Sequence, residues 1–274
     1  MKFIPYEVKT GKENMQIDSD LLDNAILQKT KEPVFRLYGW SPACISLGRN
    51  QKDDFIDTEF LAQNNIDVVR RLTGGRALLH DNEITYSFVC PTSYLKNGEN
   101  VVESYKEISQ ILIDAFAKLG IELDFGGEKK YKGHKDYCML VSTGADLCYK
   151  GKKLIGSAQF RKTFAPSPQP SPSRGEGVIP MFSEMPTCVA PPSRGEGVIP
   201  MFSEMPTCVA PPSRGEGEKY ILQHGSILYD YDRELLEKIF KEDTSSITTI
   251  REINPNITKD DIIELLSNIN KHEA

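Results

Sequence analysis

The 274-residue sequence lacks several features that would assign it to a specialised class of protein. No apolar run approaches the length of a membrane-spanning helix, and the first residues, MKFIPYE, contain no apolar stretch typical of a signal peptide. We therefore expect a cytoplasmic protein with no membrane partner. The net charge of -6 argues against nucleic acid as a partner.

Paired cysteines are also missing. The six cysteines form no CxxC pair, and none has metal-ligand spacing to the four histidines. We therefore expect neither a disulfide framework nor a metal site. With 39% hydrophobic and 26% charged residues, the chain has an ordinary globular composition and is long enough for one large core or two modest ones.

Residues 164–217 differ from the rest of the chain. The segment SRGEGVIPMFSEMPTCVAPP at 173–192 recurs letter for letter at 193–212, and SRGEG restarts at 213–217. Identity without drift, in a proline- and glycine-rich stretch without periodicity, is typical of a translated repetitive DNA element that was inserted and duplicated. We predict a disordered surface loop that interrupts a hairpin connection at a small entropic cost. Cys188 and Cys208, inside it, should carry no chemistry.

A binding loop is indicated around Gly74 and Gly75, which are surrounded by Arg70, Arg71 and Arg76. Adjacent glycines allow a tight turn and close approach to a ligand, and arginines suit a phosphate or a polarised carbonyl. Apolar residues before the loop and a period of two after it predict flanking strands. From spacing alone, glycines that only serve a hairpin turn are an equal alternative.

Periodicity predicts the remaining elements. Helices are expected at 14–28, 57–64, 100–119, 233–241 and 259–272, and strands at 33–40, 44–48, 146–149, 153–160 and 220–228. The first helix should bury a stripe formed by Ile17, Leu21, Leu22 and Ala25. The small residues Gly156, Ser157 and Ala158 would let a ligand lie against the backbone.

In combination, these segments resemble the signature of the octanoyltransferase and lipoate-protein ligase A superfamily, which has the biotin/lipoyl ligase catalytic domain. The segments that carry the resemblance are RLYGW at 36–40, SLGRNQ at 46–51, RRLTGGRALLHD at 70–81, GKKLIGSAQ at 151–159 and LQHGSIL at 222–228. The resemblance implies an α+β fold with a mixed, mostly antiparallel sheet flanked by helices. A single domain would be formed by 1–163 and 218–274, without the C-terminal accessory domain of typical lipoate ligases.

The resemblance also implies the catalytic residues. Lys153 aligns with the lysine that contacts the acyl carbonyl or the adenylate phosphate in the superfamily. Cys138 precedes Lys153 by fifteen positions, the spacing of the acyl-accepting cysteine in the cysteine-dependent octanoyltransferase branch. By residue type alone, Lys153 is an ordinary solvated charge and Cys138 a small buried hydrophobe. Cys148 is a rival nucleophile, although its place within a strand favours a structural role.

A thiol attacks as a thiolate, and a neighbouring ammonium favours that form. We therefore expect Lys153 to activate Cys138 and, with backbone N–H groups near Gly74 and Gly75, to stabilise the oxyanion. His80 is a candidate proton shuttle or, equally, a hydrogen-bonded structural histidine. The predicted substrate-binding residues are Arg70, Gly74, Gly75, Arg76, His80, Gly156, Ser157 and Ala158.

The implied reaction is transfer of an octanoyl group from acyl carrier protein to Cys138 and then to a lysine of a lipoyl domain. Glycine cleavage H protein is the expected acceptor, and a monomer is expected. Both partners are acidic, which agrees with the basic clusters at 129–135 and 150–162. No cofactor is expected, because thioester exchange is nearly isoenergetic. The alternatives are a lipoate-protein ligase that needs ATP and Mg, and a non-catalytic acyl-binding remnant that carries the insertion.

Overall fold

The computed structural model describes residues 1–127, 137–140, 144–163 and 217–269. The disordered loop expected at 164–217 lies outside the described residues except for Gly217, and so do the lysines at 129–135 and the end of the last expected helix. Apart from Gly217, the described residues belong to one unit, which the chain enters twice, before and after the repeats.

A main sheet of seven strands has the order β1-β2-β6-β10-β9-β8-β7. Its strands are β1 (Lys2–Lys9), β2 (Val34–Trp40), β6 (Glu83–Pro91), β7 (Asp124–Phe125), β8 (Leu147–Tyr149), β9 (Lys152–Thr163) and β10 (Lys219–Leu228). β1 and β2 are parallel, and all other neighbours in this sheet are antiparallel. The expected mixed, mostly antiparallel sheet is therefore confirmed. Thr163 pairs with Lys219, so the repeats do fall in a hairpin connection.

A smaller sheet holds the Gly74–Gly75 loop. Its order is β4 (Asp67–Arg70), β3 (Cys44–Leu47) and β5 (Leu78–His80), with β4 parallel and β5 antiparallel to β3. No strand was expected at Leu78–His80. Because β4 and β5 lie on opposite sides of β3, the loop at 71–77 crosses the carboxyl end of β3 and is not a hairpin turn.

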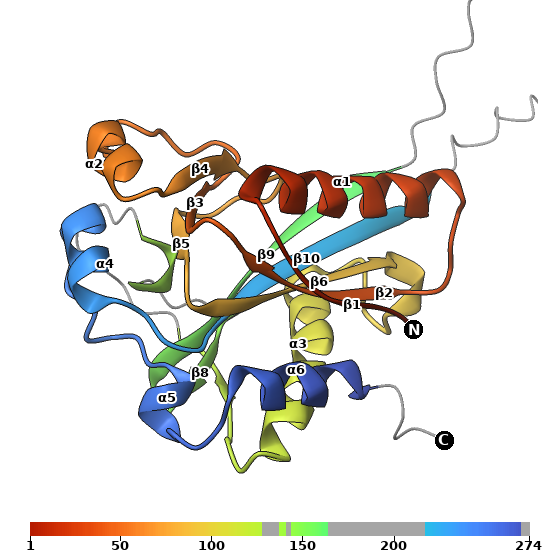
Figure 1. Cartoon of the computed structure of the whole chain (residues 1–274). Coiled ribbons are helices and arrows are strands. Elements are labelled where there is room, and N and C mark those ends of the chain that lie inside the picture. Colours follow the sequence, from red (N-terminus) through yellow and green to blue (C-terminus); the bar gives the residue numbers. More distant parts are fainter. Residues whose placement is uncertain (128–136, 141–143, 164–216, 270–274) are drawn as a thin grey trace, which may run out of the picture. The chain divides into compact units, whose positions relative to one another are not determined.

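Helices cover both faces of the main sheet, with α1 on one face and α3 and α6 on the other (Figure 1). The helices are α1 (Gly11–Leu27), α2 (Thr58–Gln63), α3 (Val101–Ala117), α4 (Arg233–Phe240), α5 (Ile250–Ile253) and α6 (Lys259–Ser267), and 3-10 turns lie at Thr92–Tyr94 and Cys138–Leu140. Capping boxes begin α1, from Thr10 to Glu13, and α6, from Thr258 to Asp261.

The stripe that α1 buries differs in part from the expected one. Leu22 and Ala25 are buried as expected, but Ile17 and Leu21 are only half-buried, and Asn14 and Asp18 are 0% and 2% exposed. Both face the sheet, where Arg36 donates to Asn14 Oδ1 at 2.6 Å and to Asp18 Oδ1 at 2.9 Å. The polar alternate residues of the central strands are thus buried beneath α1, because the helix supplies polar partners for them.

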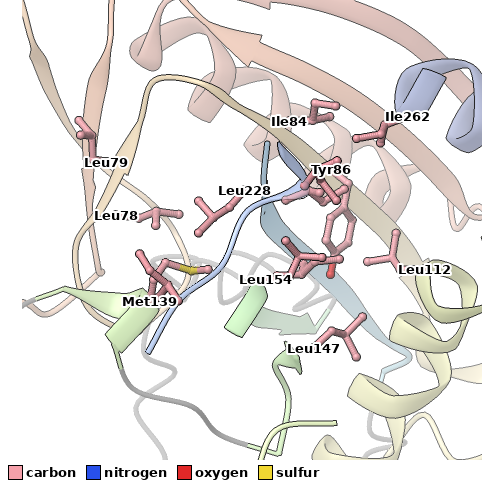
Figure 2. Packing of buried hydrophobic residues seen from close by; sticks show 14 of the residues in the cluster. Leu78, Leu79, Ile84, Tyr86, Leu112, Met139, Leu147, Leu154, Leu228 and Ile262 are labelled. Atoms are coloured by element: carbon pink, nitrogen blue, oxygen red, sulfur yellow. The ribbon is translucent and has the colours of Figure 1, made fainter. Parts of the chain in front are cut away.

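The larger hydrophobic core lies on the other face, between the sheet, α3 and α6. Figure 2 shows Tyr86 and Leu154 of the sheet, Leu112 of α3 and Ile262 of α6 as members of this core. Met139 of the 138–140 turn also belongs to it. The core therefore fixes the segment next to Cys138.

Candidate active site

Two cavities share Cys138. The histidine cavity is lined by Met15, Tyr38, Trp40, Ser46, Arg71, Leu78, His80, Thr85, Cys138, Gly156, Ser157, Ala158, His224, Gly225 and Ser226. The lysine cavity is lined by Gly74, Gly75, Arg76, Tyr105, Cys138, Ala145, Asp146, Lys153, Ser157, Ala158 and Gln159. The walls of the histidine cavity expose mainly apolar atoms, and those of the lysine cavity are more polar. The thiol thus stands at the boundary of two different environments.

The main chain around Cys138 is held on both sides. The Cys138 N–H donates to the carbonyl of Ala77 at 2.7 Å. Tyr137 is buried and stacks on Phe240 with ring centroids 4.4 Å apart, and Met139 is buried in the core. Two anchored neighbours therefore present a half-buried cysteine to the cavities.

Lys153 is 2% exposed, although a lysine just after a turn is ordinarily solvated. Its Nζ donates to Asp146 Oδ1 at 3.0 Å and to the carbonyl of Cys138 at 3.1 Å. Asp146 is also 2% exposed and balances the buried ammonium. The structure thus brings the two residues predicted to be catalytic to one cavity, and their roles stay predictions.

The small residues of β9 lie where the two cavities meet. A Cβ on Gly156 would lie 2.7 Å from Met139 Sδ and 3.0 Å from Lys153 Cε, so a side chain there would displace the Cys138 turn or the lysine. Ser157 forms a hydrogen bond to the Tyr86 hydroxyl at 2.8 Å. Ser157 and the following Ala158 line both cavities.

The Gly74–Gly75 loop forms part of the lysine cavity. Gly75 has φ +100°, a conformation that side chains rarely allow, and a Cβ there would lie 2.8 Å from Arg71 Nη2. Gly48 lies so close that a Cβ on it would be 1.9 Å from the carbonyl oxygen of Gly75. These glycines are needed for close packing of the loop, beyond any need of a turn.

The two neighbouring arginines at the start of this loop lie in different places. Arg70 donates to the carbonyls of Gly48 at 2.8 Å and Gln51 at 2.6 Å, is 40% exposed, and lines neither cavity. The Arg70 guanidinium thus braces the loop after β3, and the substrate-binding role predicted for Arg70 stays a prediction. Arg71 is buried and lines the histidine cavity, while Arg76 lines the lysine cavity as expected.

His80 has both ring nitrogens engaged. Nε2 contacts Ser46 Oγ at 2.8 Å, Nδ1 contacts Glu83 Oε1 at 3.1 Å, and the indole of Trp40 stacks on the ring at 3.9 Å. Burial lowers the pKa of His80, so the imidazole is neutral near pH 7. These contacts favour a structural role over that of a proton shuttle, although the ring lines the histidine cavity.

The other described thiols are poor nucleophiles or lie deep in the fold. Burial raises the pKa of Cys44 and of Cys90 to about 12, which keeps both thiols protonated at neutral pH. Cys148, the rival nucleophile, is 5% exposed in β8 and lines neither cavity. This placement agrees with the structural role expected for it.

Part of the expected basic surface is not available to a partner. Lys153 is buried, Lys162 pairs with Asp23 at 2.6 Å, and Arg161 donates to the Glu99 carbonyl at 3.1 Å. A run of lysines and arginines cannot distinguish buried from solvated charges. Lys153 therefore does not belong to the basic surface expected at 150–162, whereas Lys150 and Lys152 are exposed. The cluster at 129–135 lies outside the described residues.

Asp146 and Tyr105 were not expected at the site, and Arg71 was expected in the binding loop but not among the substrate-binding residues. Asp146 directly precedes β8, which pairs with the strand that carries Lys153. A hairpin with an acid before one strand and a lysine on the other was the signal available for this ion pair. Arg71 is distinguished from Arg70 only by the direction of its side chain.

The described ranges contain no group of three or more His, Cys, Asp or Glu residues suited to a metal ion. No helix within them is long and apolar enough to cross a membrane.

Comparison with known proteins identifies the catalytic domain. Residues 10–165 match the family model of the lipoyl protein ligase A/B catalytic domain. An octanoyltransferase LipM of Macrococcus caseolyticus is 38% identical over 157 residues, which cover 54% of this chain and 56% of the relative. One from Carboxydothermus hydrogenoformans is 39% identical over 162 residues, 59% of this chain and 60% of the relative. The chain thus spans little more than half the length of these relatives.

A longer match to a relative and the similarity to solved structures agree with this family match. The octanoyltransferase LipM of Clostridioides difficile is 30% identical over 241 residues, which cover 86% of this chain and 68% of the relative. A lipoate-protein ligase A bound with ATP superposes with a TM-score of 0.60 at 15% identity, covering 97% of this chain and 81% of that chain. A putative lipoate protein ligase from T. acidophilum with bound lipoic acid gives 0.58 at 15% identity, with coverages of 97% and 81%. The expected lipoate-ligase fold is confirmed, and the chain belongs to the lipoyl protein ligase A/B catalytic domain family.

Proposed function

We propose that this protein is an octanoyltransferase, which moves an octanoyl group from acyl carrier protein to Cys138 and then to a lysine of a lipoyl domain. The observation that carries the proposal is the half-buried Cys138 at the boundary of two cavities, with the Lys153 ammonium 3.1 Å from its carbonyl oxygen. The octanoyltransferase relatives support the same reaction.

In the first step the Cys138 thiolate attacks the carbonyl carbon of the carrier thioester. A new C–S bond forms, the old C–S bond breaks, and the carrier thiol leaves with the proton that Cys138 gave up. The positive charge of Lys153, moderated by its pairing with Asp146, would stabilise the negative charge that develops on the reacting atoms. The backbone N–H groups of the Gly74–Gly75 loop would stabilise the oxyanion.

The octanoyl chain is proposed to occupy the histidine cavity. An acyl chain needs an apolar surface, and the walls of this cavity expose mainly apolar atoms despite the number of polar residues around it. The polar atoms of Tyr38, Trp40 and His80 are directed to other protein groups, Asp18, Thr85 and Ser46 respectively. These polar atoms are therefore occupied by protein groups and are not directed at the chain.

The second step uses the lysine cavity. The acceptor amine attacks the thioester carbon, the amide C–N bond forms, and the C–S bond to Cys138 breaks. The departing cysteine takes up the proton that the amine loses, so the enzyme returns to its starting state. A glycine cleavage H protein would be one such acceptor.

No ATP, Mg or other cofactor is part of this proposal, because the donor is already a thioester and amide formation from it is downhill. The lipoate-protein ligase alternative would require ATP to activate a free acid. Thiol chemistry at Cys138 needs a reducing compartment, which agrees with a cytoplasmic location. We propose that the enzyme acts as a monomer.

The test is incubation with octanoyl-acyl carrier protein without ATP, followed by site-resolved mass measurement. We expect a hydroxylamine-sensitive octanoyl adduct on Cys138 that is absent in Cys138→Ser. Site resolution is required because Cys188 and Cys208 of the repeats are also present. An ATP requirement would support the ligase, and absence of any adduct or transfer would support the remnant.

A further inference from the structure

Arg71 donates hydrogen bonds through all three of its side-chain nitrogens while being only 6% exposed. Nε donates to Thr73 Oγ1 at 3.0 Å, and Nη1 donates to the carbonyl and hydroxyl of Ser46 at 2.8 and 3.2 Å. Nη2 donates to the carbonyls of Gly74 at 3.0 Å and Arg76 at 2.7 Å. None of these acceptors is a carboxylate, so the buried charge is balanced by more distant groups.

One chain of hydrogen bonds leads from Arg71 to Asp18. Thr73 Oγ1 accepts from Arg71 and contacts His224 Nε2 at 2.7 Å, while His224 Nδ1 lies 3.2 Å from Asp18 Oδ2. The Thr73 hydroxyl is thus free to donate to Nε2, and Nδ1 carries the proton toward the carboxylate. Burial acts to raise the pKa of Asp18, but hydrogen bonding from His224 and nearby positive charges lower it overall.

A second chain of the same composition leads to Glu83. Ser46 Oγ accepts from Arg71 and contacts His80 Nε2 at 2.8 Å, while His80 Nδ1 lies 3.1 Å from Glu83 Oε1. Each chain thus consists of a hydroxyl, an imidazole and a carboxylate. The two chains hold the guanidinium of Arg71 from two directions.

Arg71 in turn sets the orientation of the glycine loop. In a trans peptide unit the N–H points opposite to the carbonyl that precedes it. Because the Gly74 carbonyl is held toward Arg71, the Gly75 N–H points away from it. Gly75 and Cys138 both line the lysine cavity, and the loop ends at Ala77, whose carbonyl accepts from the Cys138 N–H.

We propose that Arg71 is a positioning residue for acyl transfer. By holding the carbonyls of Gly74 and Arg76, it aims the Gly75 N–H at the oxyanion that forms when an acyl carbonyl reacts at Cys138. The two histidine chains keep Arg71 in that position. This inference rests on the proposed function, since it assigns a role within the same reaction.

The test compares two reactions of the same thiol in the full chain. Acylation by octanoyl-acyl carrier protein passes through an oxyanion, whereas alkylation by iodoacetamide does not. The variant Ser46→Ala/Thr73→Val removes both hydroxyls that link Arg71 to the histidines. We expect the single-turnover rate constant of Cys138 acylation to fall about a hundredfold. The alkylation rate constant of Cys138 and its pH profile should stay within about twofold.

Ser87→Ala is the matched control, because Ser87 Oγ donates to Asp18 Oδ1 at 2.9 Å but lies off the path to Arg71 and lines neither cavity. Its acylation rate constant should equal that of the wild type. If the double variant does not fold, each single substitution should lower acylation about tenfold with alkylation unchanged.

Two results would overturn the positioning role: acylation that falls no further than in the control, or alkylation that falls by the same factor as acylation. A wild-type protein that is alkylated normally but never acylated would instead overturn the proposed function, and the inference with it. The two failures are therefore distinguishable.

Discussion

The two cavities that share Cys138 hold their charges in opposite ways. In the lysine cavity, Lys153 and Asp146 are in direct contact at 3.0 Å beside the cysteine. In the histidine cavity, the guanidinium of Arg71 is separated from the carboxylates linked to it by a hydroxyl and an imidazole on each side. A compact ion pair can act on charge that develops at the thiol, whereas the dispersed arrangement leaves apolar walls. One cavity is suited to the reaction and the other to the acyl chain.

Breaking the ion pair of the lysine cavity should have the largest effect. Lys153→Met leaves the Asp146 carboxylate buried without its ammonium, so the free energy of unfolding should fall by about 3–5 kcal/mol. Octanoyl adduct formation should fall at least about a hundredfold. Urea unfolding and single-turnover acylation measure the two effects.

Lys153→Met/Asp146→Leu separates stability from chemistry. It removes both charges, so most of the lost stability should return while acylation stays as slow as in the single variant. Recovery of the acylation rate in this double variant would show that Lys153 serves only to neutralise Asp146.

Filling the histidine cavity should alter chain length preference. Leu78→Phe adds bulk to a wall of this cavity, which should exclude two or three methylenes of an octanoyl chain at about 0.8 kcal/mol each. The kcat/KM for octanoyl carrier should fall about thirtyfold, and that for butanoyl carrier should change little. Leu79→Phe adds the same bulk at a neighbouring buried residue outside both cavities. Equal losses for both chain lengths in Leu78→Phe would place the acyl chain elsewhere.

The burial of His80 in the histidine cavity should be visible in the pH dependence of the free energy of unfolding. Burial lowers the pKa of His80 below its usual value of about 6.5, so the unfolded state binds more protons just below that pH. The free energy of unfolding should therefore fall as pH drops below about 6.5, by at most about 1.4 kcal/mol per pH unit. In His80→Gln this part of the slope should vanish. If the free energy of unfolding has the same pH dependence in His80→Gln as in the wild type between pH 7 and the folded-state pKa, His80 is not held neutral in the folded protein.

Arg76 tests the charge at the wall of the lysine cavity and should give the smallest effect. Arg76→Ala should raise KM for the acidic carrier about three- to fivefold and weaken its salt dependence, with kcat nearly unchanged. Arg251→Ala makes the same charge change at a side chain that is 54% exposed and lines neither cavity. Equal KM values in the two variants would exclude a specific role for Arg76.

The sequence predicted elements whose signals are local. The helix expected at 259–272 does begin at Lys259, and alternation found the central strands β6 and β10. The short β5 was missed because Leu78–His80 is too brief to show a period and is defined by its pairing with β3.

The site was predictable only where its residues match a known family pattern, because residue type alone gave Cys138 and Lys153 no catalytic role. The cysteine, the lysine and the small residues of β9 were found through their resemblance to a known pattern. Arg70 and Arg71 cannot be told apart in the sequence because they are consecutive arginines. In the structure their side chains point in different directions, so that Arg71 is buried and Arg70 is 40% exposed. Asn14 and Asp18 were unexpected on the buried face of α1, since their partners, among them Arg36, come from a distant strand.

The most direct measurement follows the octanoyl group through the enzyme. Isolated protein that carries octanoyl on Cys138 is mixed with a lipoyl domain in the absence of ATP, and both proteins are mapped by mass over time. We predict that the adduct leaves Cys138 as an octanoyl-lysine appears on the acceptor, in equal amounts and at least as fast as steady-state turnover. An adduct that persists on Cys138 while the acceptor stays unmodified would contradict the assignment of this thiol as the carrier.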